Sequence, residues 1–494
     1  MKVRAKELPT APPGALDQRR RLLVLATCCA SIVVVVMDIS IVNVALPALR
    51  HDLDASVSDL QWTLDAYTLV LSSFLVLAGS TADRVGRRRV FRVGLVVFGA
   101  GSLLCALAPS IGFLIAARGL QAVGGTMLNP VAMAIVAATF TEPAERARAI
   151  GVFGSMAGLS LSLGPVLGGV LVDGIGWRSV FWINVPIVAV ALVGTALFIP
   201  ESRAQRARRP DPVGQILVVL VLGSVVYALI ESRSLGWTSP VFVGLMTAAL
   251  LGLVGLIAYE RRRFDPLLEL RLFRSVPFTS AILMALFALC GFGAFLFTTT
   301  LYLQDARGLS AMAAGLCLLP VGALVIALSP LTGRRVGSRG PRLPLAVAGS
   351  AMALGGAVGI GLEPSTPLAV VVASYLFFGV FLGTVNPPIT YTAVAGMPTS
   401  MAGLAASLAS SGRQTGTTLG IAIAGTILGT AGSSGGTAFV EGAQGVWWMV
   451  TGLGVGILAL GLFSTGARAR MSAERAAALF EEGEPGQNTL NGRN

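Results

Sequence analysis

Four ionisable residues lie well inside stretches of sequence that are otherwise apolar: Asp38, Asp65, Arg118 and Arg413. A charged group in the hydrocarbon of a membrane is costly unless it is paired or hydrated, so each of the four is a candidate functional residue. Burial favours the neutral form of a carboxyl group, whereas a nearby arginine favours its charged form. A carboxyl group held between these two influences can take up and release a proton.

The two acids and the first arginine indicate a proton-coupled switch. We expect Asp38 to be the main proton-carrying group and Arg118 to adjust its charge state. Asp65 is a second acid that either shares the proton or attracts a cationic substrate. The alternative is a static ion pair that only fixes helix packing.

The composition places these residues in a membrane. The chain has 494 residues, of which 54% are hydrophobic and 12% charged, and its mean hydropathy is +0.79. A soluble domain of ordinary composition is far less apolar. Repeated uncharged stretches of about 20 residues match the length of a membrane-spanning helix rather than a barrel strand. The sequence therefore predicts an all-α integral membrane protein.

Charged, polar and Gly/Pro-rich interruptions divide the chain into fourteen predicted spans. The first is a retained helix, because its apolar run continues to Leu46 and is too long for the core of a cleaved signal peptide. The predicted spans cover residues 22–47, 61–82, 92–109, 112–138, 149–171, 179–199, 213–231, 240–259, 278–301, 311–331, 343–361, 367–391, 402–430 and 446–465.

The basic residues indicate an orientation. With a cytoplasmic N-terminus, the outer loops hold Arg50, Arg178, Arg233 and Arg307, and 30 of the 36 basic residues lie on the cytoplasmic side. Fourteen spans then place both termini in the cytoplasm. The net charge of +12 reflects this topology and contact with anionic lipid headgroups, so we expect no nucleic-acid partner.

The two halves of the chain share a weak repeat. ADRVGRR, at 82–88, follows the second span, and GRRVGSR, at 333–339, follows the tenth. Internal symmetry of this kind is typical of transporters, whose substrate site lies at the repeat interface near the middle of the membrane. We expect an N-terminal tail at 1–21, a six-helix bundle at 22–199, two inserted helices at 200–277, a second six-helix bundle at 278–465 and a C-terminal tail at 466–494.

The short loop between the second and third spans combines one acid with several arginines. The arginines hold the loop on the cytoplasmic side. Asp83 can also pair with them or cap a neighbouring helix, which forms a breakable latch that favours one arrangement of the bundles. The alternative is a topology anchor alone. The predicted latch residues are Gly79, Asp83, Arg84, Gly86, Arg87 and Arg88.

This loop, with the pattern G-x-x-x-D-R-x-G-R-R, resembles the signature loop of the major facilitator superfamily. Further segments, in order, are similar to those of the fourteen-helix drug:proton antiporter family: MDISIVNVALPAL, WTLDAY, RGLQAVGG, GPVLGG, GWRSVFWINVP and GRQTGTTLG. The resemblance implies the major facilitator fold, with two six-helix bundles plus two inserted helices, and drug export in exchange for protons. In the second-half loop Arg334 stands where Asp83 stands in the first, so no latch aspartate is expected there.

The fifth predicted span is rich in glycine. By resemblance it carries the antiporter motif, a tightly packed seam that prevents a leak. Small residues let helix backbones approach closely, and a proline favours a kink. The predicted seam residues are Gly154, Gly158, Gly164, Pro165, Gly168 and Gly169.

Polar and aromatic residues elsewhere in the spans are candidates for a substrate cavity. Arg413, near the middle of the thirteenth span, either contacts substrate or binds the aspartates when the outer side is closed. The predicted substrate-binding residues are Asp65, Asn43, Tyr67, Asn129, Asn386, Arg413 and Gln414, and Phe295, Tyr302 and Tyr391 are further cavity candidates.

Other function classes lack their chemistry. Both lysines, Lys2 and Lys6, lie in the N-terminal tail, so the nucleotide loop of an ATP-driven pump is not expected. One histidine, His51, and five dispersed cysteines offer neither an enzyme's nucleophile and base nor a metal cluster. We expect no enzymatic activity, no metal and no cofactor.

The sequence therefore favours a monomeric antiporter in the cytoplasmic membrane of a bacterium, driven by the proton gradient. It exports small hydrophobic and in some cases cationic drugs, antiseptics, dyes or antibiotics by alternating access. The expected partners are this small-molecule substrate, protons and membrane lipid. The alternative is a dedicated proton-coupled metabolite transporter with a narrow substrate range.

Overall fold

The computed structural model describes residues 17–203, 211–263, 269–395, 397, 399–430 and 435–481. The regular elements within these ranges are all helical. The first half of the structure comprises α1 Gln18–Asp52, α2 Val57–Val85, α3 Arg87–Ala106, α4 Ile111–Thr126, α5 Asn129–Thr139, α6 Pro143–Gly174, α7 Ser179–Trp182 and α8 Asn184–Phe198.

Two predicted spans of this half are interrupted. The span predicted at 112–138 is split into α4 and α5, and the span predicted at 179–199 into α7 and α8. Proline has no N–H to donate to the carbonyl four residues earlier. Pro130 therefore leaves the carbonyl of Thr126 without its helical partner, and Pro186 does the same for Trp182. These two residues are the last of α4 and α7.

The rest of the chain contains the inserted helices and the second half. The inserted region holds α9 Pro212–Ile230, α10 Ser232–Leu235, α11 Pro240–Glu260 and a 3₁₀ turn, η1 Leu270–Arg274. The second half comprises α12 Val276–Leu301, a π-helical turn η2 Tyr302–Ala306, α13 Ala311–Arg339, α14 Arg342–Ile360, α15 Leu368–Val394, α16 Thr399–Thr430, α17 Gly435–Ser464 and α18 Ala467–Glu481.

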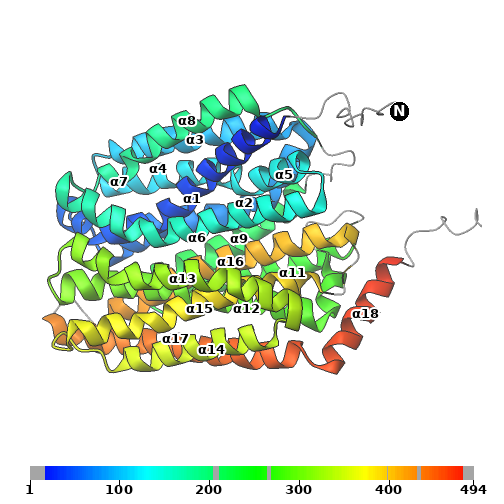
Figure 1. The fold of residues 1–494 in the computed structure, drawn as a ribbon. Coiled ribbons are helices and arrows are strands. Elements are labelled where there is room, and N and C mark those ends of the chain that lie inside the picture. Colours follow the sequence, from blue (N-terminus) through cyan, green and yellow to red (C-terminus); the bar gives the residue numbers. More distant parts are fainter. Residues whose placement is uncertain are drawn as a thin grey trace, which may run out of the picture.

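The number of membrane-crossing segments agrees with the predicted fourteen. Within the described ranges, 13 helical segments are long and apolar enough to span a membrane. The remaining one, α16, has 32 residues but carries Arg413, Gln414 and many hydroxyl side chains. The start of α1 and the helix α18 lie at the same end of the array, as an even number of crossings requires (Figure 1). We call this the terminal end, and the other the distal end.

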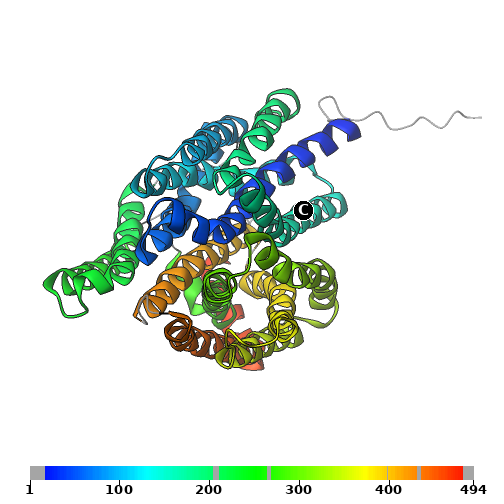
Figure 2. The same cartoon turned by 90° about the vertical axis from the view of Figure 1, so that its left-hand side faces the viewer.

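The helices gather in two groups, seen end-on in Figure 2. Helices α1–α8 pack against one another, and so do α12–α17. The two groups meet where α6 lies against α13 and where α2 lies against α16. Helix α9 contacts both α2 and α16, and α11 packs on α9, so this inserted pair lies beside the junction between the groups (Figure 2).

Helices α6 and α13 are in close contact toward the distal end and separate toward the terminal end. A Cβ atom placed on Gly169 would lie 2.5 Å from the Cα of Met312, and one on Gly315 would lie 2.3 Å from the carbonyl oxygen of Pro165. Further along α6, a Cβ on Gly158 would be 3.5 Å from Val325, and one on Gly154 would have no neighbour within 4 Å. The bundles therefore diverge toward the terminal end.

Polar contacts close the distal end. The Asp173 carboxylate, on α6, accepts hydrogen bonds from the backbone N–H groups of Ala311 (3.2 Å) and Met312 (2.8 Å) in the first turn of α13. Arg50 pairs with Asp305 at 3.3 Å. The Gln304 amide donates to the carbonyl oxygen of Val44 at 2.9 Å. A carboxylate at a helix N-terminus is a favourable arrangement, because it meets unpaired N–H groups and the positive end of the helix dipole.

Candidate functional site

A buried ion pair lies in the centre of the first bundle. Asp38 on α1 and Arg118 on α4 have exposed fractions of 0% and 1%, and a guanidinium N–H of Arg118 donates to Asp38 Oδ2. Removing one partner of such a pair leaves an uncompensated buried charge, which costs about 3–5 kcal/mol. The structure therefore brings together two of the three residues of the predicted proton-coupling group.

Three neutral polar side chains complete the surroundings of the Asp38 carboxylate. Gln121 Nε2 donates to Asp38 Oδ1 at 2.8 Å and to Ser102 Oγ at 2.7 Å. Asn184 Nδ2 donates to the same two atoms, at 3.0 and 3.1 Å. Gln121 Oε1 accepts from Arg118 at 2.7 Å. All of these side chains are fully buried, and we refer to Asp38, Ser102, Arg118, Gln121 and Asn184 as the polar centre.

The guanidinium group of Arg118 has further partners on α2 and α7. Its Nε–H donates to the carbonyl oxygen of Thr63 at 3.0 Å. The group lies over the ring of Tyr67, with 4.3 Å between its central carbon and the ring centroid, and 5.7 Å from that of Phe181. A cation held against an aromatic face and away from water is stabilised by about 2 kcal/mol. Arg118 thus connects three separate segments of the first bundle.

The local sequence explains how these side chains meet. Arg118 and Gln121 are three residues apart, so they project from the same face of α4. Glycines let α3 approach α4 closely: a Cβ on Gly101 would lie 2.6 Å from the backbone nitrogen of Gln121, and one on Gly124 would lie 2.3 Å from that of Phe98. Asn184 enters the polar centre as the first residue of α8, directly after the break that follows α7.

Asp65 lies apart from the polar centre. It is fully buried on α2, its Oδ1 accepts a hydrogen bond from Thr68 Oγ at 3.2 Å, and its Oδ2 has no partner. Within the described part of the chain, no hydrogen bond or ion pair joins Asp65 to Asp38 or Arg118. The expected three-residue group is therefore a pair and a separate acid.

The predicted substrate-binding residues do not form one cluster. Tyr67 belongs to the surroundings of Arg118. The Asn43 amide donates to the carbonyl oxygen of Ile39 at 2.8 Å, and its own oxygen is buried without a partner. Asn129 begins α5 of the first half and is half-buried. The others lie in the second half: Arg413 and Gln414 are half-buried, Asn386 and Tyr391 are exposed, and Tyr302 donates to the carbonyl oxygen of Glu363 at 2.7 Å.

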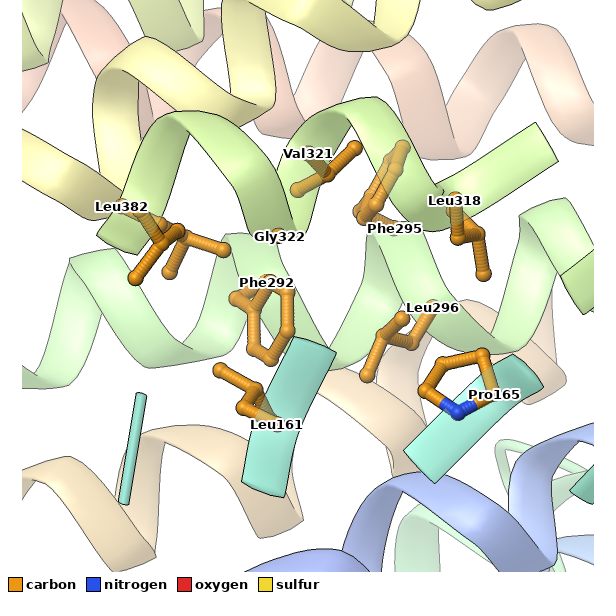
Figure 3. Close-up of a pocket in the computed structure, with 10 residues that line it drawn as sticks. Leu161, Pro165, Phe292, Phe295, Leu296, Leu318, Val321, Gly322 and Leu382 are labelled. Atoms are coloured by element: carbon orange, nitrogen blue, oxygen red, sulfur yellow. The ribbon is translucent and has the colours of Figure 1, made fainter. Parts of the chain in front are cut away.

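A small apolar cavity lies between the two bundles, where α6 meets the second half (Figure 3). Its volume of about 20 Å³ is sufficient for one water molecule. Phe295 is among its lining side chains and stacks on Phe378, with 3.9 Å between ring centroids. The lining residues are Leu161, Pro165, Phe292, Phe295, Leu296, Leu318, Val321, Gly322, Val325 and Leu382.

The predicted latch residues contact other parts of the first bundle. Asp83 pairs with Arg87 at 2.9 Å, one turn further along the chain. Gly86 has a φ of 126°, which favours glycine, and a Cβ there would lie 2.5 Å from the carboxylate of Glu201. That carboxylate also accepts from the backbone N–H of Arg88 at 3.1 Å. Arg84 is exposed, and Gly79 lies in ordinary contact with Pro130 on α5.

The predicted seam residues lie on two faces of α6. A Cβ on Gly164 would lie 1.9 Å from Ser40 Oγ, and one on Gly168 would lie 2.8 Å from Ile41, so these glycines permit close packing against α1. Gly169 and Pro165 meet α13 instead, as described above. Gly158 is in ordinary contact with α13, and Gly154 lies outside the tight part of the seam.

Comparison with known proteins identifies the family. Residues 28–421 match the Major Facilitator Superfamily. The chain belongs to this superfamily. It is 37% identical to multidrug resistance protein Stp of Mycobacterium tuberculosis over 392 residues, which cover 79% of this chain and 73% of that protein. It is also 37% identical to puromycin resistance protein pur8 of Streptomyces alboniger over 408 residues, or 82% and 80% of the two chains.

A solved structure supports the major facilitator fold. A bacterial homologue of the human lysosomal transporter Spinster, in an inward-facing and unoccupied conformation, aligns with a TM-score of 0.63 and 17% identity, over 95% of this chain and 100% of that one. At this identity the likeness concerns the fold alone. The expected kinship with fourteen-helix drug exporters, which are transporters and not enzymes, is confirmed by the family match and the curated relatives.

Three side chains of the polar centre were missed by sequence reasoning in this major facilitator protein. Gln121 and Asn184 lie in the segments RGLQAVGG and GWRSVFWINVP, whose family resemblance was noted, but neutral amides gave no signal of their own. The i, i+3 spacing from Arg118 could have identified Gln121. Ser102 and Asn184 could not be found in this way, because only the fold brings α3 and α8 against α1.

Proposed function

We propose that this chain is a proton-coupled antiporter that exports small hydrophobic, in some cases cationic, drugs or antibiotics by alternating access. The single observation that carries the proposal is the fully buried Asp38–Arg118 pair. A carboxylate with three donors and no contact with water is held as an anion only while its partners stay in place. Uptake of a proton would therefore require and stabilise a different arrangement of α1 and α4.

The proposed cycle uses the two ends of the molecule in turn. The distal end is taken as the outer side, because the basic residues of the sequence gather on the terminal end. In the state seen here the outer side is closed and the bundles diverge toward the cytoplasm, where substrate enters. After the bundles rock to open the outer side, Asp38 takes up a proton and substrate leaves.

The substrate class follows from the surfaces that line the junction of the bundles. The cavity beside Pro165 holds no more than a water molecule in this state, but the apolar and aromatic side chains that border it would favour flat hydrophobic compounds once the bundles separate there. Asp65 is a buried acid with an unpaired oxygen and supplies the attraction for a cation. Relatives named for multidrug resistance agree with this class.

The remaining expectations are part of the same proposal. The domain boundaries at 22–199, 200–277 and 278–465 describe two bundles that move against each other, with the inserted helices beside their junction. The Asp83 loop acts as the latch, the glycines of α6 as the seam, and a single chain carries both bundles, so a monomer suffices. The proton gradient of a bacterial cytoplasmic membrane is the driving force.

A dedicated carrier is the second candidate. Several relatives are named for one compound, such as puromycin resistance protein pur8 and the methylenomycin A resistance protein of Streptomyces coelicolor, which is 35% identical over 403 residues. A chain of this kind would move one antibiotic rather than a range of dyes.

The test is gradient-driven uptake of ethidium by inverted membrane vesicles with an imposed pH difference. Wild type should accumulate the dye and stop when the gradient is collapsed, and Asp38→Asn should reduce gradient-driven uptake at least a hundredfold. Asp54→Asn is the matched control: this acid is exposed, and its φ of 51° suits asparagine. Gradient-driven uptake by Asp38→Asn would contradict the proposal, and uptake of puromycin without ethidium would favour the dedicated carrier.

A further inference from the structure

The two ends of the Asn184 amide differ in their hydrogen bonding. Its Nδ2 donates to Asp38 Oδ1 and Ser102 Oγ, whereas its Oδ1 is buried without a partner. A buried carbonyl oxygen without a donor is destabilising relative to a satisfied one. The amide group that donates to the Asp38 carboxylate therefore also carries one unused acceptor.

The protonation state of Asp38 decides whether that acceptor is needed. An ionised carboxylate only accepts, and it has three donors here, from Arg118, Gln121 and Asn184. A protonated carboxyl group must also donate one hydrogen bond. Gln121 Oε1 already accepts from Arg118, and Ser102 Oγ accepts from both amides. Among the five described side chains of the polar centre, Asn184 Oδ1 is the acceptor that has no donor.

We propose that Asn184 is a positioning residue that responds to the protonation of Asp38 by rotating its amide group. With Asp38 ionised, Nδ2 donates to the carboxylate; with Asp38 protonated, Oδ1 accepts the carboxyl O–H, and Nδ2 turns away. The proposal rests on the role of Asp38 as the proton carrier. An amide is suited to this task, because its two ends exchange places by rotation about one bond.

The position of Asn184 links this rotation to the rest of the span. It is the first residue of α8, separated from α7 only by Ile183. Residues just before α7 reach the distal end of α1, where Trp177 Nε1 donates to Asp52 at 2.7 Å and Arg178 pairs with the same carboxylate at 2.8 Å. The start of α8 is therefore joined to these distal contacts through the short helix α7.

Few titratable groups surround Asp38 and could confuse the measurement. Arg118 faces it from α4, Tyr67 lies against Arg118 from α2, and Cys105 on α3 donates to Gln121 Oε1 at 3.8 Å. Arginine stays charged throughout the range of the experiments, and a buried thiol or phenol stays neutral in it. Asp65, a second buried acid, lies on α2 apart from the polar centre, so a change near neutral pH is assigned to Asp38 only where Asp38→Asn removes it.

The first test is an infrared difference spectrum of the purified wild-type protein between about pH 5 and pH 9. Protonation of Asp38 should produce a carboxyl band, and at the same pH the Asn184 side-chain carbonyl band should move to lower frequency as it accepts a hydrogen bond. Both changes should be absent from Asp38→Asn, and the second from Asn184→Leu. A wild-type carboxyl band without the amide change would overturn this inference alone, whereas no carboxyl band would overturn the proposed function.

The second test compares two near-isosteric replacements in the vesicle assay. Asn184→Leu can neither donate nor accept, and should lower uptake at least tenfold at every pH. In Asn184→Asp, the introduced carboxyl group and that of Asp38 share one proton. The O–H of the protonated group then takes the place of the Asn184 N–H as hydrogen-bond donor. Below about pH 7 uptake by Asn184→Asp should therefore exceed that by Asn184→Leu at least threefold, and this advantage should disappear by about pH 9, as that proton is lost.

Two outcomes contradict the rotation. Wild-type uptake by Asn184→Leu would show that the amide is unnecessary. If Asn184→Leu takes up dye at the full rate but the midpoint of its pH profile lies at higher pH, Asn184 only donates to the anion. Variant protein that does not elute as a monodisperse species is set aside, and the infrared comparison of wild type with Asp38→Asn then decides.

Discussion

The centre of the first bundle holds a charged pair, whereas the centre of the second is filled by aromatic rings. In α1–α8, Asp38 and Arg118 are surrounded by buried amide and hydroxyl groups. In α12–α17, the ring of Phe295 stacks on Phe378 at 3.9 Å and meets Tyr375 edge-on at 5.4 Å. The repeat that relates the two halves is thus a repeat of helices and not of side-chain chemistry.

This difference indicates a division of labour. Buried polar groups are sensitive to protonation, because each hydrogen bond must be exchanged when a charge is gained or lost. Aromatic surfaces respond to the size and polarity of a ligand and hardly to pH. Under the proposed function, the first bundle therefore sets the proton dependence of transport and the second contributes most of the apolar contact with substrate.

The largest expected effect comes from removing the cation of the charged pair in the first bundle. Arg118→Leu leaves the Asp38 carboxylate buried without its cation and should lower stability by about 3–5 kcal/mol, with loss of gradient-driven transport. The double variant Asp38→Asn/Arg118→Leu should recover most of the stability and none of the coupling. Thermal unfolding in detergent measures both. Equal destabilisation of the single and double variants would show that the pair has only a packing role.

A smaller effect should separate substrate contact from proton coupling. Phe295→Leu removes an aromatic surface from the cavity between the bundles and should raise the KM for an aromatic dye several-fold, with an unchanged pH profile. Phe278→Leu is the matched control on the same helix, since Phe278 is fully buried but does not line the cavity. A shift of the pH profile by Phe295→Leu would contradict the division between bundles.

The smallest effect concerns the contact between the two bundles. Asp173→Asn removes the charge that meets the first turn of α13, an interaction of about 0.3–1 kcal/mol. We expect the backbone amides of Ala311 and Met312 to exchange hydrogen for deuterium up to about fivefold faster, which mass spectrometry can follow. Unchanged exchange, with Asp54→Asn as the reference, would show that the distal end is held closed by other contacts.

Much of the fold could be predicted, because a membrane imposes simple rules. Span length and the distribution of arginines determine where helices lie and how many times the chain crosses. The spans containing Pro130 and Pro186 each remain one membrane crossing, but the break within each was not predicted, and α17 begins at Gly435 rather than at residue 446. Hydropathy does not register a missing backbone donor, and it ends a helix wherever glycine and serine accumulate.

The candidate site could be predicted only in its charged members. Asp38 and Arg118 were found because an ionisable residue in an apolar helix is conspicuous, whereas Asn386 was included for its polarity and is exposed. The sequence by itself determined the membrane-embedded helices, their number and the identity of the buried charges, since these depend on local composition. Only the tertiary structure decided that Arg118 pairs with Asp38 and not with Asp65, and that Ser102 and Asn184 join them, because such contacts depend on how distant helices pack.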